Sequence, residues 1–318
     1  MKKVFVLAPR EDWVCDRFVA EWNVTSHANI TNTFNPAEAD VLWLLAGWCW
    51  RQLPVQLLKT REVGVTIHHI DPQKFDAREF ACRDAFVDWY HVPCDVTAAE
   101  VRKHTTKQVF VQPFWLNDVM WHPLDRAACK SAYDLKGRYV IGSFQRDTEG
   151  SDLRSPKLAK GPDVFVDVVD ALRAGGLDVV VVLAGWRRQY IISRLNASGI
   201  EYRYFERCDQ HTTNDLYNAL DLYIVGSRCE GGPQALFECA LTATPVVSTR
   251  VGAAELVLGA DSDCIFDIGS GGPSYYHGFY DRHISAVDVV GNSNRVKRFT
   301  MPHGMIPFDS FLSKMRGI

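Results

Sequence analysis

Short, continuous runs of apolar residues alternate along the chain with longer runs whose apolar positions recur every three or four residues. A continuous run is typical of a strand buried on both faces of a parallel sheet, whereas a three-to-four-residue period predicts a helix. Strands are expected at residues 4–8, 41–45, 63–67, 109–112, 139–142, 177–183, 201–205, 222–225 and 245–248. Helices are expected at residues 12–22, 93–103 after a turn, 162–172, 188–195, 214–220 and 308–315. Thr97, with Glu100 three residues later, predicts a capping box for the second of these helices.

The strands and helices fall into two series joined by a loop-like stretch, residues 112–137, which contains two prolines and several charges. Strands that alternate with helices predict a parallel sheet covered on both faces. We therefore expect an α/β fold with two Rossmann-like, doubly wound parallel-sheet domains facing a cleft. The first domain is expected at residues 1–135 and the second at residues 136–290. Residues 291–318 are expected to form a tail that packs back on the first domain.

Composition and charge exclude several classes of protein. The formal net charge of −3 argues against a nucleic-acid partner, because such proteins usually carry a basic excess. The nine cysteines are scattered and form no C-x-x-C pair, which argues against a zinc site or a disulfide framework and favours free thiols in a reducing cytoplasm. No stretch approaches the roughly 20 apolar residues of a membrane-spanning helix. We expect a cytoplasmic protein.

The segment EGGPQALFE, residues 230–238, places an acid at each end of a glycine turn. It follows a predicted strand, and Pro233 suits the first turn of a helix. Backbone amides and the helix dipole make such a helix start attractive to anions, and Gly231 and Gly232 allow a phosphate close to the backbone. The segment predicts a diphosphate site with a sugar near each acid; a plain helix cap with solvated glutamates is the alternative.

The longer stretch EGGPQALFECALTATPVVSTRVGAAELV, residues 230–257, resembles the donor-binding segment of retaining glycosyltransferases of family four, which have the GT-B fold. The resemblance implies that Glu230 contacts the donor sugar and Glu238 the ribose. It also implies that the turn between them, with Gln234 at the start of the helix, holds the phosphates.

A second match to that family lies upstream. It consists of Gly142 and Ser143 at a strand end, then Arg146, and then Lys160 before Gly161. The resemblance implies that Arg146 and Lys160 neutralise the departing diphosphate. The spacing between them is longer than is usual in the family, so Arg154 and Lys157 are rival candidates.

Two histidines, His68 and His69, follow a predicted strand of the first half, where family members often carry a histidine near the donor sugar and the acceptor. Side chains alternate along a strand, so one of the two is expected to face the site. A structural histidine is the alternative, and with no further ligand cluster nearby we expect no metal. Trp48 and Trp50, also after a strand, are candidate sugar-stacking side chains, with core packing as the alternative.

The resemblance implies transfer of a sugar from a nucleoside diphosphate sugar, a UDP- or GDP-sugar, to a hydroxyl acceptor. No cofactor or metal is expected. The acceptor is expected to be a carbohydrate or glycolipid, which leaves room for peripheral contact with a membrane. The alternatives are a non-catalytic sugar-nucleotide-binding module and a GT-B sugar-nucleotide epimerase.

Overall fold

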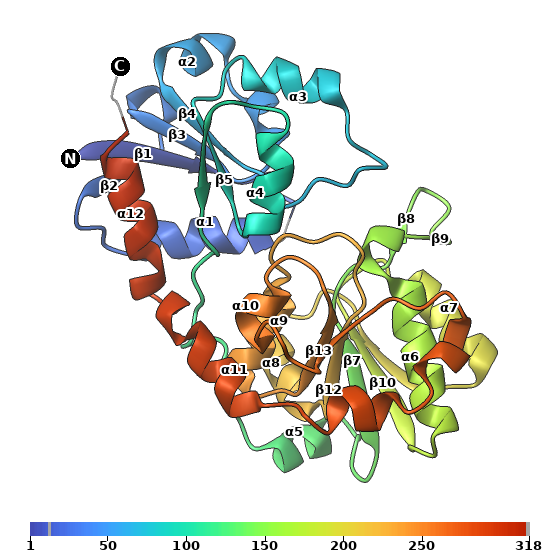
Figure 1. Ribbon diagram of the computed structural model, residues 1–318. Coiled ribbons are helices and arrows are strands. Elements are labelled where there is room, and N and C mark those ends of the chain that lie inside the picture. The colour runs from blue at the N-terminus through green and yellow to red at the C-terminus, as the bar shows by residue number, and fades with distance from the viewer. Residues whose placement is uncertain (12–13, 316–318) are drawn as a thin grey trace. The chain divides into compact units, whose positions relative to one another are not determined.

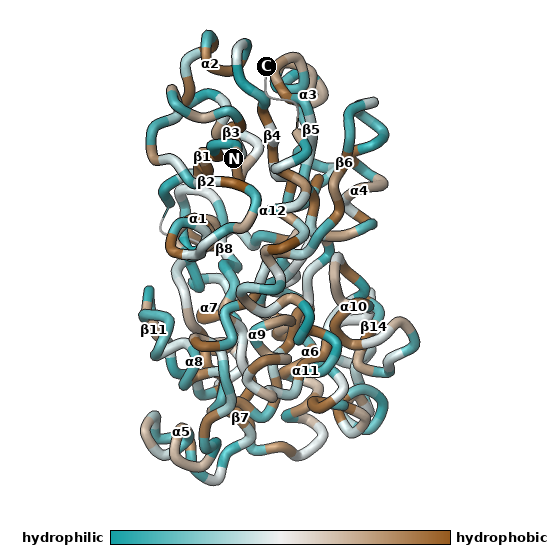
Figure 2. Tube along the Cα trace, turned by 90° about the vertical axis from the view of Figure 1, so that its left-hand side faces the viewer, coloured by the Kyte–Doolittle hydropathy of each residue, from teal (hydrophilic) through white to brown (hydrophobic). Residues whose placement is uncertain are grey.

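The computed structural model describes residues 1–11 and 14–315, which form two compact units (Figure 1). The described residues up to 115 and from 299 onward form the first unit, and residues 116–298 form the second. Each unit contains a six-stranded parallel sheet with helices on both faces. Hydrophobic segments run through the interior of each unit, and hydrophilic segments lie mainly on its outer turns (Figure 2). The predicted α/β class with two doubly wound sheets is therefore confirmed.

The sheet of the first unit has the strand order β2-β1-β3-β4-β5-β6. Its strands are β1 (Lys2–Leu7), β2 (Ile30–Asn32), β3 (Val41–Leu44), β4 (Glu62–Thr66), β5 (Trp89–Val92) and β6 (Gln108–Val111). Its helices are α1 (Val14–Val24), α2 (Val55–Thr60), α3 (Ala77–Asp84), α4 (Asp95–Arg102) and α12 (Ile306–Ser313). The predicted helix 12–22 thus corresponds to α1, and its first two residues lie outside the described part of the chain.

Tryptophans fill one face of this first sheet. Trp22, Trp43, Trp89 and Trp115 are buried in one cluster with Phe114 and with Phe308 of α12. The ring of Phe308 stacks on that of Trp43 at 5.2 Å between centroids. These four tryptophans are therefore core residues.

The sheet of the second unit has the strand order β11-β10-β7-β12-β13-β14. Its strands are β7 (Tyr139–Ser143), β10 (Val179–Ala184), β11 (Tyr202–Phe205), β12 (Leu222–Val225), β13 (Val246–Thr249) and β14 (Ile265–Phe266). Its helices are α5 (Arg126–Ala132), α6 (Pro162–Ala174), α7 (Gln189–Ser198), α8 (Gln210–Ala219), α9 (Gln234–Thr242), α10 (Ala254–Leu258) and α11 (Val289–Val296). An antiparallel pair, β8 (Thr148–Glu149) and β9 (Ser155–Pro156), follows β7. This strand order is that of dinucleotide-binding Rossmann folds.

The chain divides between the units at positions that differ from the predicted boundaries at 135 and 290. Residues 116–135 belong to the second unit, because α5 packs on α8 and the backbone there is bound by asparagines of α8. The N–H groups of His122 and Leu124 donate to Asn214 and Asn218, at 3.2 and 2.7 Å. Polar side chains thus attach a segment whose composition resembles a linker.

The tail also begins later than predicted. Residues 291–298 stay with the second unit, where α11 packs on α9 and α10. Only residues from 299 onward join the first unit, where α12 packs against β1 and β2. The buried carboxylate of Asp309 accepts hydrogen bonds from the backbone and the side chain of Asn29.

The predicted capping box at Thr97 is wrong. The helix begins at Asp95, with Cys94 as its N-cap residue, three positions before the predicted cap. Thr97 lies inside α4, buried, and its hydroxyl donates to the carbonyl oxygen of His68 at 3.3 Å. A tertiary contact therefore uses the hydroxyl that the local pattern assigned to capping.

Candidate functional site

The predicted donor-site residues of the second unit gather at the carboxyl ends of β7 and β12. These strands are neighbours in the sheet, and the chain order reverses between them. Ligands of open α/β sheets bind in the crevice outside such a reversal point. Residues 142–146 end or follow β7, and residues 226–233 connect β12 to α9.

Two glycines let other segments approach the loop after β12 closely. Gly161 has a φ of +58°, and a Cβ there would lie 1.7 Å from the carbonyl oxygen of Gly226. Gly252 has a φ of +50°, and a Cβ there would lie 2.0 Å from the carbonyl oxygen of Gly231. Only glycine permits both the backbone angle and the approach. The loop is therefore held by contacts that side chains at these two positions would displace.

Lys160 and Glu230 form an ion pair. The Nζ of Lys160, in the short turn before α6, donates to Oε1 of Glu230 in the loop after β12. Both side chains are largely buried, with 11% and 10% of their surfaces exposed. The two residues were expected to have separate partners, a phosphate and a sugar. The structure instead joins them directly, 70 positions apart in the sequence.

The helix after the glycine turn begins one residue later than expected. Pro233 is the N-cap residue of α9, and Gln234 is its first helical residue. Glu238 lies in the second turn and is 7% exposed. Its Oε2 accepts a hydrogen bond of 2.8 Å from the hydroxyl of Tyr217. Burial, and then the Glu238 charge, raise the pKa of Tyr217 well above its ordinary value, so the phenol stays a donor to this carboxylate.

The predicted residues at the end of β7 and after it have different environments. Gly142 is packed against the side chain of Leu220, where a Cβ would lie 2.2 Å from a methyl carbon, so this glycine serves core packing. Ser143 is buried. Arg146 donates from Nε to the carbonyl oxygen of Thr148 at 2.9 Å. The rival candidate Arg154 is exposed, in the connection from β8 to β9. The other rival, Lys157, lies three residues before Lys160 and donates its backbone N–H to the carbonyl oxygen of Asp147.

Positive charge gathers around Trp186, which follows β10 and is partly exposed. The guanidinium carbons of Arg146, Arg187 and Arg207 lie 5.2, 4.9 and 5.1 Å from the centre of its ring. Each distance is within the range of a cation–π contact. This group of arginines adds to the attraction of this edge of the sheet for an anion.

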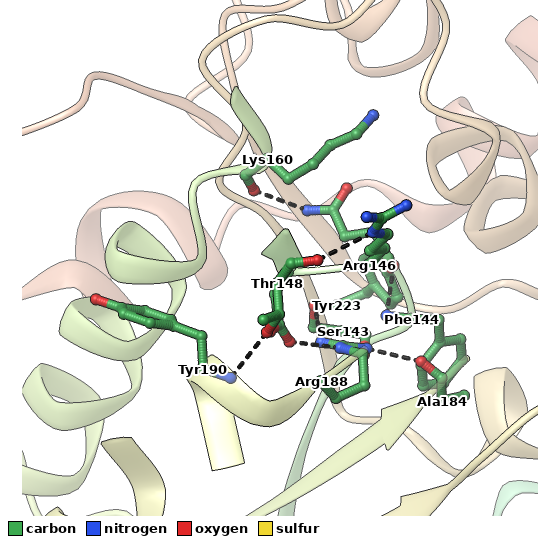
Figure 3. A network of polar contacts seen from close by, with 11 residues as sticks. Ser143, Phe144, Arg146, Thr148, Lys160, Ala184, Arg188, Tyr190 and Tyr223 are labelled. Carbon is green, nitrogen blue, oxygen red and sulfur yellow. Dashed lines mark hydrogen bonds and ion pairs between the residues drawn. The ribbon is translucent and has the colours of Figure 1, made fainter. Parts of the chain in front are cut away.

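A buried ion pair beneath this edge was missed by sequence reasoning. Nε of Arg188 lies 2.6 Å from Oδ2 of Asp147, and both residues are almost fully buried. Figure 3 shows the guanidinium of Arg188 between Ser143 and Ala184. The partners are 41 positions apart and belong to no motif, so no local signal identifies the pair.

The two histidines predicted for the site, His68 and His69, follow β4 in the first unit. A ring nitrogen of His68 lies 2.8 Å from the carbonyl oxygen of Leu45 and 3.4 Å from Sγ of Cys15, and the ring stacks on Phe114. Burial raises the pKa of the Cys15 thiol to about 12. These contacts fit the structural role that was the alternative for this histidine. His69 is half-buried.

The two candidate tryptophans differ. Trp48 is exposed to 46%. Trp50 packs on Phe86 in the core, and its indole donates to Glu79 at 3.1 Å. Trp50 is thus a packing residue, and only Trp48 presents a broad face to a ligand. Within residues 1–11 and 14–315, no group of three or more His, Cys, Asp or Glu side chains could hold a metal ion. None of the helices in this part of the chain is long and apolar enough to span a membrane.

Part of the second unit matches a family model, and part of the chain matches a curated protein. Residues 153–271 match the family model of the glycosyl transferases group 1. The lipopolysaccharide core biosynthesis mannosyltransferase LpsB of Rhizobium meliloti (strain 1021) is 29% identical over 150 residues, which are 44% of this chain and 40% of the relative. The match thus spans less than half of the length of this curated relative.

Solved structures resemble the whole chain. Anabaena HepE in complex with UDP and glucose has a TM-score of 0.73 and 13% identity, over 99% of this chain and 100% of that one. A glycosyltransferase from Rickettsia africae ESF-5 has a TM-score of 0.67 and 12% identity, over 98% and 97%. Identities this low establish the fold alone. Residues 153–271 thus match the glycosyl transferases group 1, and the chain as a whole has the GT-B fold.

Proposed function

We propose that this protein is a retaining glycosyltransferase. It moves a sugar from a nucleoside diphosphate sugar, a UDP- or GDP-sugar, to a hydroxyl group of a carbohydrate or glycolipid. The observation that carries the proposal is the largely buried Lys160–Glu230 ion pair. It lies beside the start of α9, where the chain order of the sheet reverses between β7 and β12. The match of residues 153–271 to the glycosyl transferases group 1 supports it.

The phosphates are assigned to the α9 start, Lys160 and Arg146. Backbone N–H groups of a first helical turn lack partners within the helix and carry the positive end of its dipole. Lys160 has three N–H bonds, so it can donate to Glu230 and to a phosphate oxygen together. Arg146, fixed at Thr148, is placed on the same edge of the sheet. Glu230 then meets the donor sugar, and Glu238 the ribose.

In the proposed reaction, the bond between the anomeric carbon and the diphosphate oxygen breaks. A bond to the acceptor oxygen forms on the same face, and the acceptor proton passes to the departing phosphate. Charge that develops on the leaving diphosphate is stabilised by preorganised donors, a term worth about 2.7–4 kcal/mol per donor in comparable sites. Lys160 and Arg146 supply the positive charge that stabilises the leaving group, so activity is expected to persist in EDTA.

The test is to incubate the purified chain with a panel of nucleoside diphosphate sugars and to measure released nucleoside diphosphate. One donor is expected to be cleaved. Replacement of both Lys160 and Arg146 by methionine is expected to slow release at least about 100-fold. Full activity in this double variant would overturn the phosphate assignment. Binding without any release would indicate a sugar-nucleotide-binding module, and conversion of the donor sugar to an isomer would indicate an epimerase.

The part of the proposal that concerns the first unit comes from the family resemblance. His69 is proposed for the contact with sugar or acceptor, since His68 is bound to Leu45 and stacked on Phe114. His69→Ala is expected to reduce transfer more than its effect on folding explains. A variant with full transfer activity would remove His69 from the site.

A further inference from the structure

The ion pair of Arg188 and Asp147 lies where β7 and β10 end. Nε of Arg188 bonds Oδ2 of Asp147 at 2.6 Å. One terminal nitrogen, Nη1, donates to the carbonyl oxygens of Ala184 (2.7 Å) and Ser143, and Nη2 donates to Oγ of Ser143 at 3.1 Å. Every nitrogen of the guanidinium is therefore bonded. A single side chain joins the last residues of two adjacent strands to the segment that follows β7.

The segment that follows β7, up to residue 148, is held by hydrogen bonds at almost every residue. The N–H of Phe144 donates to the Tyr223 hydroxyl at 2.9 Å. The hydroxyl of Thr148 donates to Oδ1 of Asp147 at 2.6 Å and accepts from the N–H of Tyr190 at 2.9 Å (Figure 3). The N–H groups of Asp147 and Thr148 both donate to the carbonyl oxygen of Arg187. The segment 143–148 thus has one fixed path, and Arg188 lies beneath it.

The two cations proposed for the diphosphate are both attached to this segment. Arg146 belongs to it, and its Nε donates to the carbonyl oxygen of Thr148 at 2.9 Å. The Gln145 amide donates to the carbonyl oxygen of Lys160 at 3.1 Å. A shift of the segment would therefore move Arg146 directly and Lys160 through its backbone.

Stability alone does not explain a pair of charges so deep in the unit. Removing two ions from water is costly, and well-packed apolar residues of similar volume often give equal or greater stability. At the amino ends of the same two strands, Arg138, just before β7, pairs with Asp178, just before β10, at 2.7 Å. Arg138 also pairs with Glu201, just before β11, at 2.8 Å, and this group lies near the surface. The fold thus joins these strands by an arginine at both edges, and the charges are fully buried only at the edge where the ligand is proposed to bind.

We propose that Arg188, through Asp147 and the carbonyl oxygens of Ser143 and Ala184, is a positioning residue that places Arg146 and Lys160 against the diphosphate. This inference rests on the proposed function. It assigns Arg188 no contact with substrate. The buried Arg188–Asp147 pair is then needed for phosphate recognition and not for the fold.

The test compares three variants: Arg188→Met with Asp147→Leu, which removes both charges; Arg188→Lys, which keeps the charge but not the planar fork; and Arg138→Met, the control at the opposite edge. For each, affinity is measured by calorimetry for UDP, GDP and ADP, and for the matching nucleosides by ligand-observed NMR. Melting temperatures are recorded without ligand. The double replacement is expected to weaken nucleoside diphosphate binding at least about tenfold, with nucleoside binding unchanged. The nucleoside diphosphate affinity of Arg188→Lys is expected to lie between those of the double variant and the wild type. Arg138→Met is expected to bind with the wild-type affinity.

The outcomes separate the two proposals. If the wild type binds a nucleoside diphosphate and the charge-free variant binds it equally well, the positioning role of Arg188 is overturned while the proposed function stands. Equal losses for nucleoside and nucleoside diphosphate would also overturn it, because they would show a general collapse of the site. If the double variant does not fold, Arg188→Lys supplies the comparison. If the wild type binds no nucleoside diphosphate at all, the proposed function fails and this inference with it.

Discussion

Replacing Glu230 by glutamine should strengthen nucleoside diphosphate binding while it impairs sugar transfer. Glu230 accepts a hydrogen bond from Lys160, and the pair is largely buried. The carboxylate therefore neutralises a cation that the diphosphate needs. Glutamine keeps the size and a carbonyl oxygen for Lys160 but removes the negative charge. Lys160 should then attract the phosphate without a carboxylate that competes for its charge.

The magnitude follows from the geometry. Because the N–H bonds of an ammonium are tetrahedral, two acceptor atoms that each lie about 3 Å from it are about 5 Å apart. At an effective dielectric constant of about 20, two unit charges at that distance repel by about 3 kcal/mol. Salt and partial exposure reduce this to about 1.4 kcal/mol, since the Debye length is about 10 Å at 0.1 M. We therefore expect affinity for a nucleoside diphosphate to rise about tenfold in Glu230→Gln and the gain to shrink at high salt.

The assay is isothermal calorimetry at two salt concentrations, together with donor turnover. Glu201→Gln is the matched control, since Glu201 is paired with Arg138 and Arg203 at the amino edge of the same sheet. It should change neither affinity nor turnover. Glu230→Gln should lose at least about 100-fold in turnover, because the donor sugar loses its contact. Unchanged or weaker diphosphate binding in Glu230→Gln, with a normal control, would refute the reasoning.

Three further predictions concern stability and backbone geometry. Gly252→Ala should destabilise the fold by about 2 kcal/mol more than Gly137→Ala in urea unfolding, since both have positive φ but only at Gly252 would a Cβ meet a carbonyl oxygen, that of Gly231; equal losses would contradict the close approach. Burial lowers the pKa of His91 to about 3, so the unfolded chain binds a proton below pH 6.5 that the folded chain does not. Stability should fall by about 2 kcal/mol from pH 7 to pH 5 on this account, and His91→Gln should flatten that slope. Phe308→Ala should cost about 3–5 kcal/mol in the same unfolding assay, because its ring is buried against the tryptophan cluster; a loss below 1 kcal/mol would show that α12 is weakly attached.

The sheets were predictable because buried parallel strands have a strong local pattern. The six residues of β10 are all apolar and all buried, and no helix or loop pattern competes with such a run. The predicted boundaries between the two units were less accurate. Residues 116–135 have the charges and the proline of a linker, yet α8 binds their backbone through Asn214 and Asn218, more than 90 positions away. Side-chain contacts at such separations leave no periodic trace.

In the candidate site, too, features with a local sequence pattern were predictable and contacts between distant residues were not. The turn and helix of residues 230–238 have a local signature, and the structure has a helix there, with Pro233 as its N-cap residue and not in its first turn. The pairing of Glu230 with Lys160 depends on the fold bringing two loops together, and the sequence pattern assigned each a separate partner. The buried pair of Arg188 and Asp147 has no signature, because an arginine and an aspartate are ordinary surface residues until the fold buries them.

The central claim is that a nucleoside diphosphate binds at the carboxyl ends of β7 and β12. The most direct measurement is a crystal structure of the chain with the nucleoside diphosphate that calorimetry identifies. The account predicts phosphate oxygens within about 3.2 Å of the Nζ of Lys160 and of a backbone N–H in the first turn of α9. Phosphates bound elsewhere, with Lys160 still paired to Glu230 alone, would contradict it.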